Sequence, residues 1–206
     1  MEMLHKSVNE FTAALASRAS VPGGGSASAL AGALAAALGG MVGELTVGKK
    51  QYAAAEPILR ELLGQAEELR EALLACVEKD AAALAPLAEA YAIPKDDPAR
   101  AETLEACLRA AAAPPMEVLE LTARTVELLR SFADMGSPLA VSDAAVGAAL
   151  AAAALRGAEI NVRVNTRLMR DRTAAAALDD RARTIAESAL RRAEAVYNDV
   201  YGRLAP

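Results

Sequence analysis

The sequence predicts an all-α protein, a multi-helix bundle with two central helices that are rich in alanine and glycine. Hydrophobic residues make up 54% of the 206 residues, but aromatic residues make up only 3%. The apolar residues are mostly alanine and leucine, which favour helices, whereas strands are enriched in β-branched and aromatic residues. No segment alternates as a strand would, and no repeat indicates a solenoid. The length suits a single domain over residues 1–206.

The predicted helices follow one another along the whole chain. Apolar residues at a spacing of three to four positions predict amphipathic helices, and proline and glycine clusters separate them. Ser26 is expected to cap the second helix, and Ser142 or Asp143 the sixth. The expected helices span residues 4–18, 26–47, 55–91, 99–113, 116–134, 142–169 and 179–204.

Small side chains also predict how the bundle assembles. Helices rich in alanine pack closely but bury little apolar area each. A chain of this kind gains stability by burying helix faces against a second copy of itself. We therefore expect a homo-oligomer.

Charge and cysteine usage exclude several classes of protein. The net charge of −5 comes without a basic stripe interleaved with aromatic residues, so we expect no nucleic-acid partner. Cys76, Cys107 and the single His5 show no ligand spacing, so we expect no metal and no cofactor, with both cysteines buried in a reducing compartment and His5 on the surface. No apolar run resembles a signal peptide, which favours a soluble, cytoplasmic protein.

One stretch requires a membrane check. Residues 27–43 carry no charge and are about long enough to span a bilayer. They consist largely of alanine and glycine, however, and charged residues follow at Glu44 and Lys49 without flanking aromatic residues. We interpret the stretch as a buried central helix and expect no membrane insertion.

The first candidate site is the turn Pro22-Gly23-Gly24-Gly25-Ser26 at the start of a predicted helix. Glycines let a ligand approach the backbone, and the N–H groups and dipole of a helix N-terminus favour anionic or carbonyl oxygens. No Gly-Lys-Ser/Thr follows and no strand precedes, so the turn is neither a Walker A motif nor a dinucleotide fingerprint. A tight connection between helices is the alternative, but three consecutive glycines favour a ligand role.

The second candidate is Asp80. Its helical spacing from Leu73, Val77, Leu84 and Leu87 places the carboxylate on an apolar stripe. A carboxylate there is costly unless it is paired or used. Proton transfer and an ion pair with a neighbouring Arg or Lys remain equal alternatives.

Two further groups are weaker candidates. Lys49 and Lys50 follow the expected second helix, where they favour its dipole; recognition of carboxylates on a substrate tail is the alternative. Asn161 and Asn165 lie four residues apart and so share a packed helix face, where their amides need partners from a polar heterocycle or from a neighbouring backbone. Asp143, beside Ser142, is more simply a helix cap.

Together these residues resemble the cyclodeaminase/cyclohydrolase family. That family includes the cyclodeaminase part of formiminotransferase-cyclodeaminase and the stand-alone bacterial methenyltetrahydrofolate cyclohydrolases. The order and spacing of the blocks over nearly the whole chain carry the resemblance. The blocks are Phe11, Pro22 to Ser26, Met41-Val42, Leu45-Thr46, Gly48 to Tyr52, Asp80-Ala81, Tyr91, Pro94-Lys95, Ser142-Asp143, Gly157-Ala158, Asn161-Val162 and Asn165.

The resemblance implies an all-α dimer with folate bound in a groove near the dimer interface. It makes Asp80 the catalytic residue and assigns substrate binding to the glycine turn, Lys49, Lys50, Lys95, Ser142, Asp143, Asn161 and Asn165. Leu84 stands where the family usually has an aromatic residue, and Ala145 where it often has glycine. The substrate is a tetrahydrofolate derivative, and a separate formiminotransferase is a possible partner.

The resemblance leaves three functions open. The first is formimidoyltetrahydrofolate cyclodeaminase, which releases ammonia and forms 5,10-methenyltetrahydrofolate. The second is methenyltetrahydrofolate cyclohydrolase, and the third is a non-catalytic helical protein that binds folate or a partner. Both reactions need a proton shuttle near one electrophilic carbon, and a single carboxylate can serve.

Overall fold

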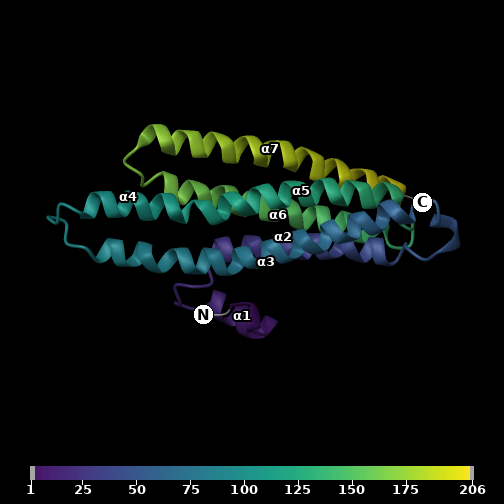
Figure 1. Cartoon of the computed structure of the whole chain (residues 1–206), viewed down its shortest axis with the longest axis horizontal. Helices are drawn as coiled ribbons and strands as arrows, with labels where there is room; N and C mark the ends of the chain where they lie inside the picture. Colours follow the sequence, from purple (N-terminus) through teal and green to yellow (C-terminus); the bar gives the residue numbers. More distant parts are fainter. Residues whose placement is uncertain (1–2, 205–206) are drawn as a thin grey trace.

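The computed structural model describes residues 3–204, and within that range the regular elements are all helices (Figure 1). This confirms the predicted all-α class. Seven α-helices and two short 3-10 helices follow one another along the chain. They are η1 (Met3–His5), α1 (Val8–Leu15), α2 (Gly24–Glu44), η2 (Lys50–Tyr52), α3 (Glu56–Ala92), α4 (Arg100–Ala111), α5 (Ala113–Met135), α6 (Val141–Thr166) and α7 (Arg172–Arg203).

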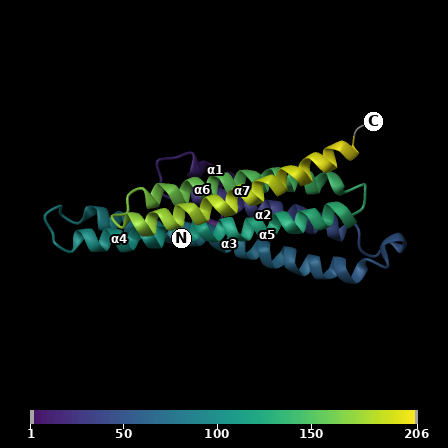
Figure 2. The ribbon, with the colours of Figure 1, turned by 90° about the horizontal axis from the view of Figure 1, so that it is seen from above.

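The helices form an elongated bundle around α5, which contacts α2, α3, α6 and α7 (Figures 1 and 2). The most extensive contacts join α2 to α6 and α3, and α6 to α7. The hairpin between α3 and α4 forms one tip of the molecule, and the connections that follow α2 and α5 form the other (Figure 1). Residues of the α3–α4 hairpin therefore lie at the opposite end of a long molecule from residues of the connections that follow α2 and α5.

The pair α2 and α6 runs antiparallel at close range. The start of α2 meets the end of α6, because Gly24 lies beside Asn161, and the two helices remain in contact as far as Ala35 and Gly147. A Cβ on Gly157 would lie 2.2 Å from Ser28 Oγ, so this approach requires a residue without a side chain. Small residues thus let the two backbones approach each other in the middle of the bundle.

Both α2 and α6 are long and apolar enough to pass a length-and-composition test for a membrane span. In each, about half of the most apolar window is buried inside the bundle, 56% for α2 and 50% for α6. This burial against other helices of the same chain is what the core helix of a bundle shows.

The predictions of serine and aspartate caps on the two central helices are wrong. Helix α2 begins at Gly24 with Gly23 as its N-cap, and α6 begins at Val141 with Ala140 as its N-cap. Neither helix has a side-chain cap hydrogen bond. Ser26, Ser142 and Asp143 therefore lie inside the first turns. The bundle fixes these helix starts by packing, which overrides the local capping preference.

Other helix boundaries differ from the predicted ones for local reasons. Helix α7 begins at Arg172, seven residues before the predicted start, because the Asp171 side chain accepts a hydrogen bond from the Ala174 N–H. The first predicted helix is shorter and starts at a capping box formed by Ser7 and Glu10. The predicted break at Pro114 is only a one-residue junction, because both prolines fit the first turn of α5.

Candidate functional site

Asp80 is held by the first turn of α2. The Ser26 N–H donates to Asp80 Oδ2 at 2.7 Å, and Ser26 Oγ lies 2.8 Å from the same oxygen. The hydroxyl also lies 3.2 Å from the Val77 carbonyl oxygen, and the Ser26 side chain is 0% exposed. The carboxylate thus meets the positive end of the α2 dipole, which favours its negative charge.

This arrangement tests one of the two alternatives for Asp80, the ion pair. Within residues 3–204, no lysine or arginine forms an ion pair with it. The predicted ion-pair alternative is therefore wrong for this part of the chain. A backbone N–H and a buried hydroxyl replace the cation, so Oδ2 is fixed in place while the residue remains half-buried.

Gly25 explains one of the three glycines. A Cβ at this position would lie 2.0 Å from Asp80 Oδ1 and 2.5 Å from its carboxyl carbon. Any side chain would push the carboxylate away from the helix terminus. Glycine at position 25 is therefore required for the Asp80 contact, a reason independent of backbone flexibility.

Asn161 joins the same cluster from α6. Its side chain lies beside Gly24, whose Cβ would be 3.4 Å from Asn161 Nδ2. The Nδ2 group donates to the Gly157 carbonyl oxygen at 2.7 Å. We call Gly23 to Ser26, Asp80 and Asn161 the aspartate end of α2.

Asn165 lies one helical turn further along α6. Its Nδ2 group donates to the carbonyl oxygens of Ala111 and Asn161, at 3.1 and 3.0 Å. Backbone carbonyls are therefore the partners of both asparagine NH₂ groups, which confirms the backbone alternative for these donors. Asn165 thereby ties α6 to the junction of α4 and α5.

A cavity of about 380 Å³ runs along α3; Glu78 and Ala81, on either side of Asp80 in the sequence, line it, but Asp80 itself does not. Alanines and Leu84 line it on α3, and Ser20 and Val21 close it from the segment before α2. Leu84 stands where the family usually has an aromatic residue, so this difference changes the wall of the cavity. The lining is mostly apolar, which suits a flat organic group.

The predicted lysines lie at the other end of α2. Lys49, Lys50 and Gln51 line a cavity of about 730 Å³ together with Ser137, Pro138 and Leu139. Lys49 Nζ donates to Ser137 Oγ at 3.3 Å, and the Ser137 N–H donates to Thr46 Oγ1 at 2.8 Å. We call residues 46–51 with 137–139 the lysine end. Sequence reasoning missed the contribution of Ser137 and Leu139, which no spacing rule connects to the lysines.

The two ends are far apart within one chain. Helix α2 has 21 residues, so its length is about 30 Å at roughly 1.5 Å per residue. Ser142 and Asp143 start α6 near the lysine end, directly after the 136–140 turn. Lys95 lies in the hairpin between α3 and α4, about 20 Å beyond Asp80 along α3. The structure therefore brings the glycine turn, Asp80 and Asn161 together, with Asn165 bonded to Asn161, and separates Lys49, Lys50, Lys95, Ser142 and Asp143 from them.

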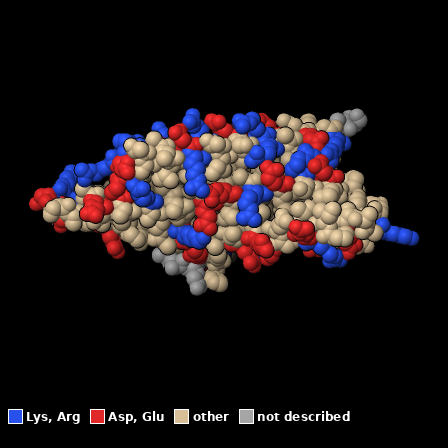
Figure 3. Space-filling model, turned by 45° about the horizontal axis from the view of Figure 1, so that its top comes forward, with Lys and Arg blue, Asp and Glu red and all other residues tan. Residues whose placement is uncertain are grey.

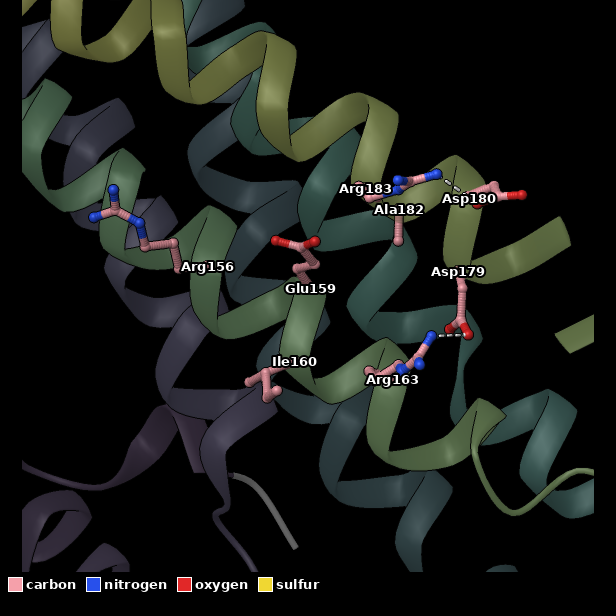
Figure 4. A pocket seen from close by; sticks show the side chains of 8 residues that line it. All are labelled: Arg156, Glu159, Ile160, Arg163, Asp179, Asp180, Ala182 and Arg183. Atoms are coloured by element: carbon pink, nitrogen blue, oxygen red, sulfur yellow. Dashed lines mark hydrogen bonds and ion pairs between the residues drawn. The ribbon is translucent and has the colours of Figure 1, made fainter. Parts of the chain in front are cut away.

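The cavity between α6 and α7, of about 580 Å³, is a weaker candidate (Figure 4). Its charged groups largely neutralise one another: Arg163 Nη1 lies 2.5 Å from Asp179 Oδ2, and Arg183 Nη2 lies 2.8 Å from Asp180 Oδ1. The face that includes α7 likewise mixes acidic and basic residues without a patch of one sign (Figure 3). Glu159 also lines this cavity, but in the part of the chain that the structure describes no helix N-terminus or buried hydroxyl holds it as Ser26 holds Asp80.

The cysteines differ from each other. Cys76 is buried one turn before Asp80, and burial, reinforced by the negative charge of Glu117, raises the pKa of its thiol to about 12. It is therefore a neutral thiol at ordinary pH and no nucleophile. Cys107 is only partly buried, with Sγ 3.6 Å from the Pro86 carbonyl oxygen, so the prediction that both are buried is wrong for it. His5 is exposed, as predicted.

Comparison with known proteins connects this geometry to a family. The sequence model of the formiminotransferase-cyclodeaminase family matches residues 7–184. A methenyltetrahydrofolate cyclohydrolase of Methylorubrum extorquens is 36% identical over 172 residues, covering 82% of this chain and 83% of that protein. The mouse formimidoyltransferase-cyclodeaminase is 33% identical over 82% of this chain, which spans only 32% of the mouse protein.

A solved structure is similar over the whole fold. The crystal structure of a formiminotetrahydrofolate cyclodeaminase from Thermotoga maritima superposes with a TM-score of 0.85 at 27% identity. The match covers 97% of this chain and 100% of that one. The bundle described above is therefore the architecture of that protein as well.

Proposed function

Because the chain belongs to the formiminotransferase-cyclodeaminase family, we propose that it is an enzyme acting on the one-carbon unit that bridges N5 and N10 of tetrahydrofolate. The observation that carries the proposal is Asp80, a half-buried carboxylate fixed through one oxygen at the α2 terminus. A positioned carboxylate of this kind is suited to general acid–base catalysis.

We favour hydrolysis of 5,10-methenyltetrahydrofolate. The support is the Methylorubrum cyclohydrolase, a relative that this chain matches over most of both lengths. In this reaction water attacks the methenyl carbon while Asp80 takes a proton from that water molecule. The C–N5 bond then breaks, N5 receives the proton from Asp80, and the remaining hydroxyl proton leaves to solvent as the formyl group forms. The product is 10-formyltetrahydrofolate, and one proton is released in balance.

Cyclodeamination is the second candidate, supported by the likeness to the Thermotoga cyclodeaminase over the whole chain. Here N10 attacks the formimino carbon, Asp80 carries the N10 proton to the formimino nitrogen, and a second proton, taken up from solvent, lets that nitrogen leave as ammonia and leaves the methenyl cation. The mouse relative is named a formimidoyltransferase as well as a cyclodeaminase, and most of its length lies outside the match. If this chain deaminates, a separate formiminotransferase would supply its substrate.

The glycine turn would position the folate, and the cavity along α3 would exclude water from part of the bound folate. Gly23 and Gly24 leave the backbone open beside Asp80, with Gly24 exposed. Rigid placement of the one-carbon unit against one oxygen of the carboxylate would supply much of the acceleration. The proposal involves no metal or other cofactor.

An absorbance assay of methenyltetrahydrofolate tests the proposal. The purified protein is given methenyltetrahydrofolate in one cell and formiminotetrahydrofolate in another. We expect enzyme-dependent loss of methenyltetrahydrofolate in the first. Appearance of methenyltetrahydrofolate in the second would instead support cyclodeamination, and no enzyme-dependent change in either would leave only the non-catalytic, folate-binding alternative.

A further inference from the structure

Two oxygens at the aspartate end have no hydrogen-bond partner among residues 3–204. Both contacts of Asp80 with Ser26 are made through Oδ2, which leaves Asp80 Oδ1 free. The side chain of Asn161 donates through Nδ2, which leaves Asn161 Oδ1 free. In the same range Thr122 Oγ1 is the only buried side-chain nitrogen or oxygen without a partner, so both Oδ1 atoms are open to solvent. The site therefore offers two acceptors to the hydrogens of a bound molecule.

The orientation of the Asn161 amide is fixed by its neighbours. Nδ2 donates to the Gly157 carbonyl oxygen at 2.7 Å, a bond that only the NH₂ side of the amide can make. Gly157 leaves room for Ser28, whose hydroxyl donates to the Gly24 carbonyl oxygen at 2.7 Å. Asn165 Nδ2 in turn donates to the Asn161 backbone carbonyl oxygen at 3.0 Å. The amide oxygen of Asn161 is therefore held in place against the first turn of α2.

The two free oxygens flank the same helical turn. A Cβ on Gly25 would lie 2.0 Å from Asp80 Oδ1, and a Cβ on Gly24 would lie 3.6 Å from Asn161 Oδ1. These glycines are consecutive, with Cα atoms about 3.8 Å apart. Helix α2 contacts both α3, which carries Asp80, and α6, which carries Asn161 (Figure 1). Gly24 is exposed, so a small molecule can reach the turn between the two oxygens.

We propose that Asn161 is a second catalytic residue, and that its Oδ1 and Asp80 Oδ1 together hold the attacking water. This inference rests on the hydrolysis proposed above. A water molecule has two hydrogens, which match the two acceptors, and each oxygen–oxygen distance in such a bridge is about 2.8 Å. With both hydrogens directed away, a lone pair of the water faces the methenyl carbon.

The two acceptors differ in what they do with the protons. The ionised Asp80 takes one proton as the C–O bond forms, and it passes this proton to N5 as the C–N5 bond breaks. The amide oxygen of Asn161 is too weak a base to be protonated. It accepts a hydrogen bond from the remaining hydroxyl until the formyl group forms and that proton leaves to solvent.

Cyclodeamination gives Asn161 no such role. In that reaction N10 of the folate is the nucleophile, and no water adds to the carbon. An Asn161 that orients water therefore accelerates hydrolysis alone. An Asn161 that binds the pterin ring would instead affect both reactions and the affinity for every folate.

Asn161→Leu tests this role. Leucine has a similar size but no acceptor, and α6 keeps its backbone hydrogen bonds. We expect kcat for methenyltetrahydrofolate to fall about 10- to 100-fold. KM should stay within about twofold of the wild-type value, as should the Kd of tetrahydrofolate measured by titration calorimetry. A rise in KM and Kd with an unchanged kcat would overturn the proposal, because it would show that Asn161 binds the folate itself.

The same substitution on another helix is the matched control. Asn198 lies on the exposed side of α7, and Asn198→Leu should keep the wild-type kcat. Asn161→Ala, checked by its Tm, is the second variant at the site and should also lose rate. Any cyclodeaminase activity of the wild type should persist in Asn161→Leu. Equal losses in both reactions would contradict a role limited to water.

Wild-type turnover separates this inference from the proposed function. If the wild type does not hydrolyse methenyltetrahydrofolate, the proposed hydrolysis is wrong and the role of Asn161 is wrong with it. If the wild type hydrolyses it and both folded Asn161 variants match its kcat, only the role of Asn161 is overturned. Loss of kcat in both variants, with an unchanged Kd for tetrahydrofolate, supports the shared water site.

Discussion

The two ends of α2 differ in how firmly their polar groups are held. At the aspartate end, Asp80 is fixed by a backbone N–H and a fully buried hydroxyl, and it lies so close to Gly25 that a Cβ there would be 2.0 Å from Oδ1. At the lysine end, Lys49 has one contact of 3.3 Å to Ser137, and Leu139 is 91% exposed. A group that transfers a proton must be positioned rigidly, whereas lysines can recognise carboxylates as mobile point charges. On the proposed function, this difference favours chemistry at the aspartate end and recognition at the lysine end.

Gly25→Ala should break the aspartate end most severely. Its Cβ would lie 2.0 Å from Asp80 Oδ1, so the carboxylate must leave the α2 terminus. Overpacking of this kind costs about 1–3 kcal/mol, which lowers Tm by roughly 3–10 °C for a domain of this size. Displacement of the carboxylate should reduce kcat by about 100-fold or more. Calorimetry and the absorbance assay measure the two effects.

Gly23→Ala is the matched control for stability. Nothing lies within 4 Å of a Cβ at Gly23, so Tm should change by no more than about 2 °C. Equal loss of stability in both alanine variants would show that the contact with Asp80 is not the reason for glycine at position 25.

Ser26→Ala should have an intermediate effect. It removes the hydroxyl that contacts Asp80 Oδ2 and the Val77 carbonyl oxygen, but it keeps the backbone N–H. Loss of a buried hydrogen bond costs about 1–2 kcal/mol. We expect kcat to fall about tenfold with little change in KM, because Ser26 positions Asp80 and is too buried to touch the substrate. A rise in KM alone would contradict this role.

The double variant Lys49→Ala/Lys50→Ala should affect binding more than chemistry. Both side chains are exposed, so Tm should stay within about 2 °C of that of the wild type. We expect KM for a folate with several glutamates to rise about tenfold, with a smaller rise for the monoglutamate, because fewer carboxylates are lost as partners. An equal change for both substrates would argue against recognition of the tail.

Labelling of the two cysteines tests the rigidity of the aspartate end, and we expect this test to show the smallest effect. A maleimide at neutral pH should label partly buried Cys107 and leave Cys76 unlabelled until the chain unfolds. Folding raises the pKa of Cys76 from 9.0 to about 12, so the unfolded chain loses this proton first. Its contribution to stability is therefore complete below pH 9 and decreases as the pH rises toward 12. Labelling of both cysteines at equal rates in the native protein would contradict a rigid aspartate end.

The sequence was sufficient to predict the helices and Asp80. Ala and Leu periodicity sets the helix count, and the apolar stripe through Leu73, Val77 and Leu84 isolates Asp80 on a packed face. The partner of Asp80 could not be predicted. Ser26 lies 54 residues away, and local preference indicated a cap instead of a contact between helices.

The separation of the lysines from Asp80 was also beyond sequence reasoning. Both belong to one set of sequence blocks, yet a straight helix of 21 residues lies between them. The order of such blocks along a sequence indicates which residues belong to a site, but it does not give the distances between them in space. Only the packing of α2 against α3 and α6 shows which residues one chain brings together.

The most direct test of the central claim is the turnover of methenyltetrahydrofolate by Asp80→Asn. Asparagine keeps the size of the side chain and an oxygen that can accept the Ser26 N–H, so helicity and Tm should remain close to those of the wild type. The neutral amide cannot transfer the proton, and we expect kcat to fall by about 10² to 10⁴. A folded Asp80→Asn protein that retains the wild-type rate would contradict the account.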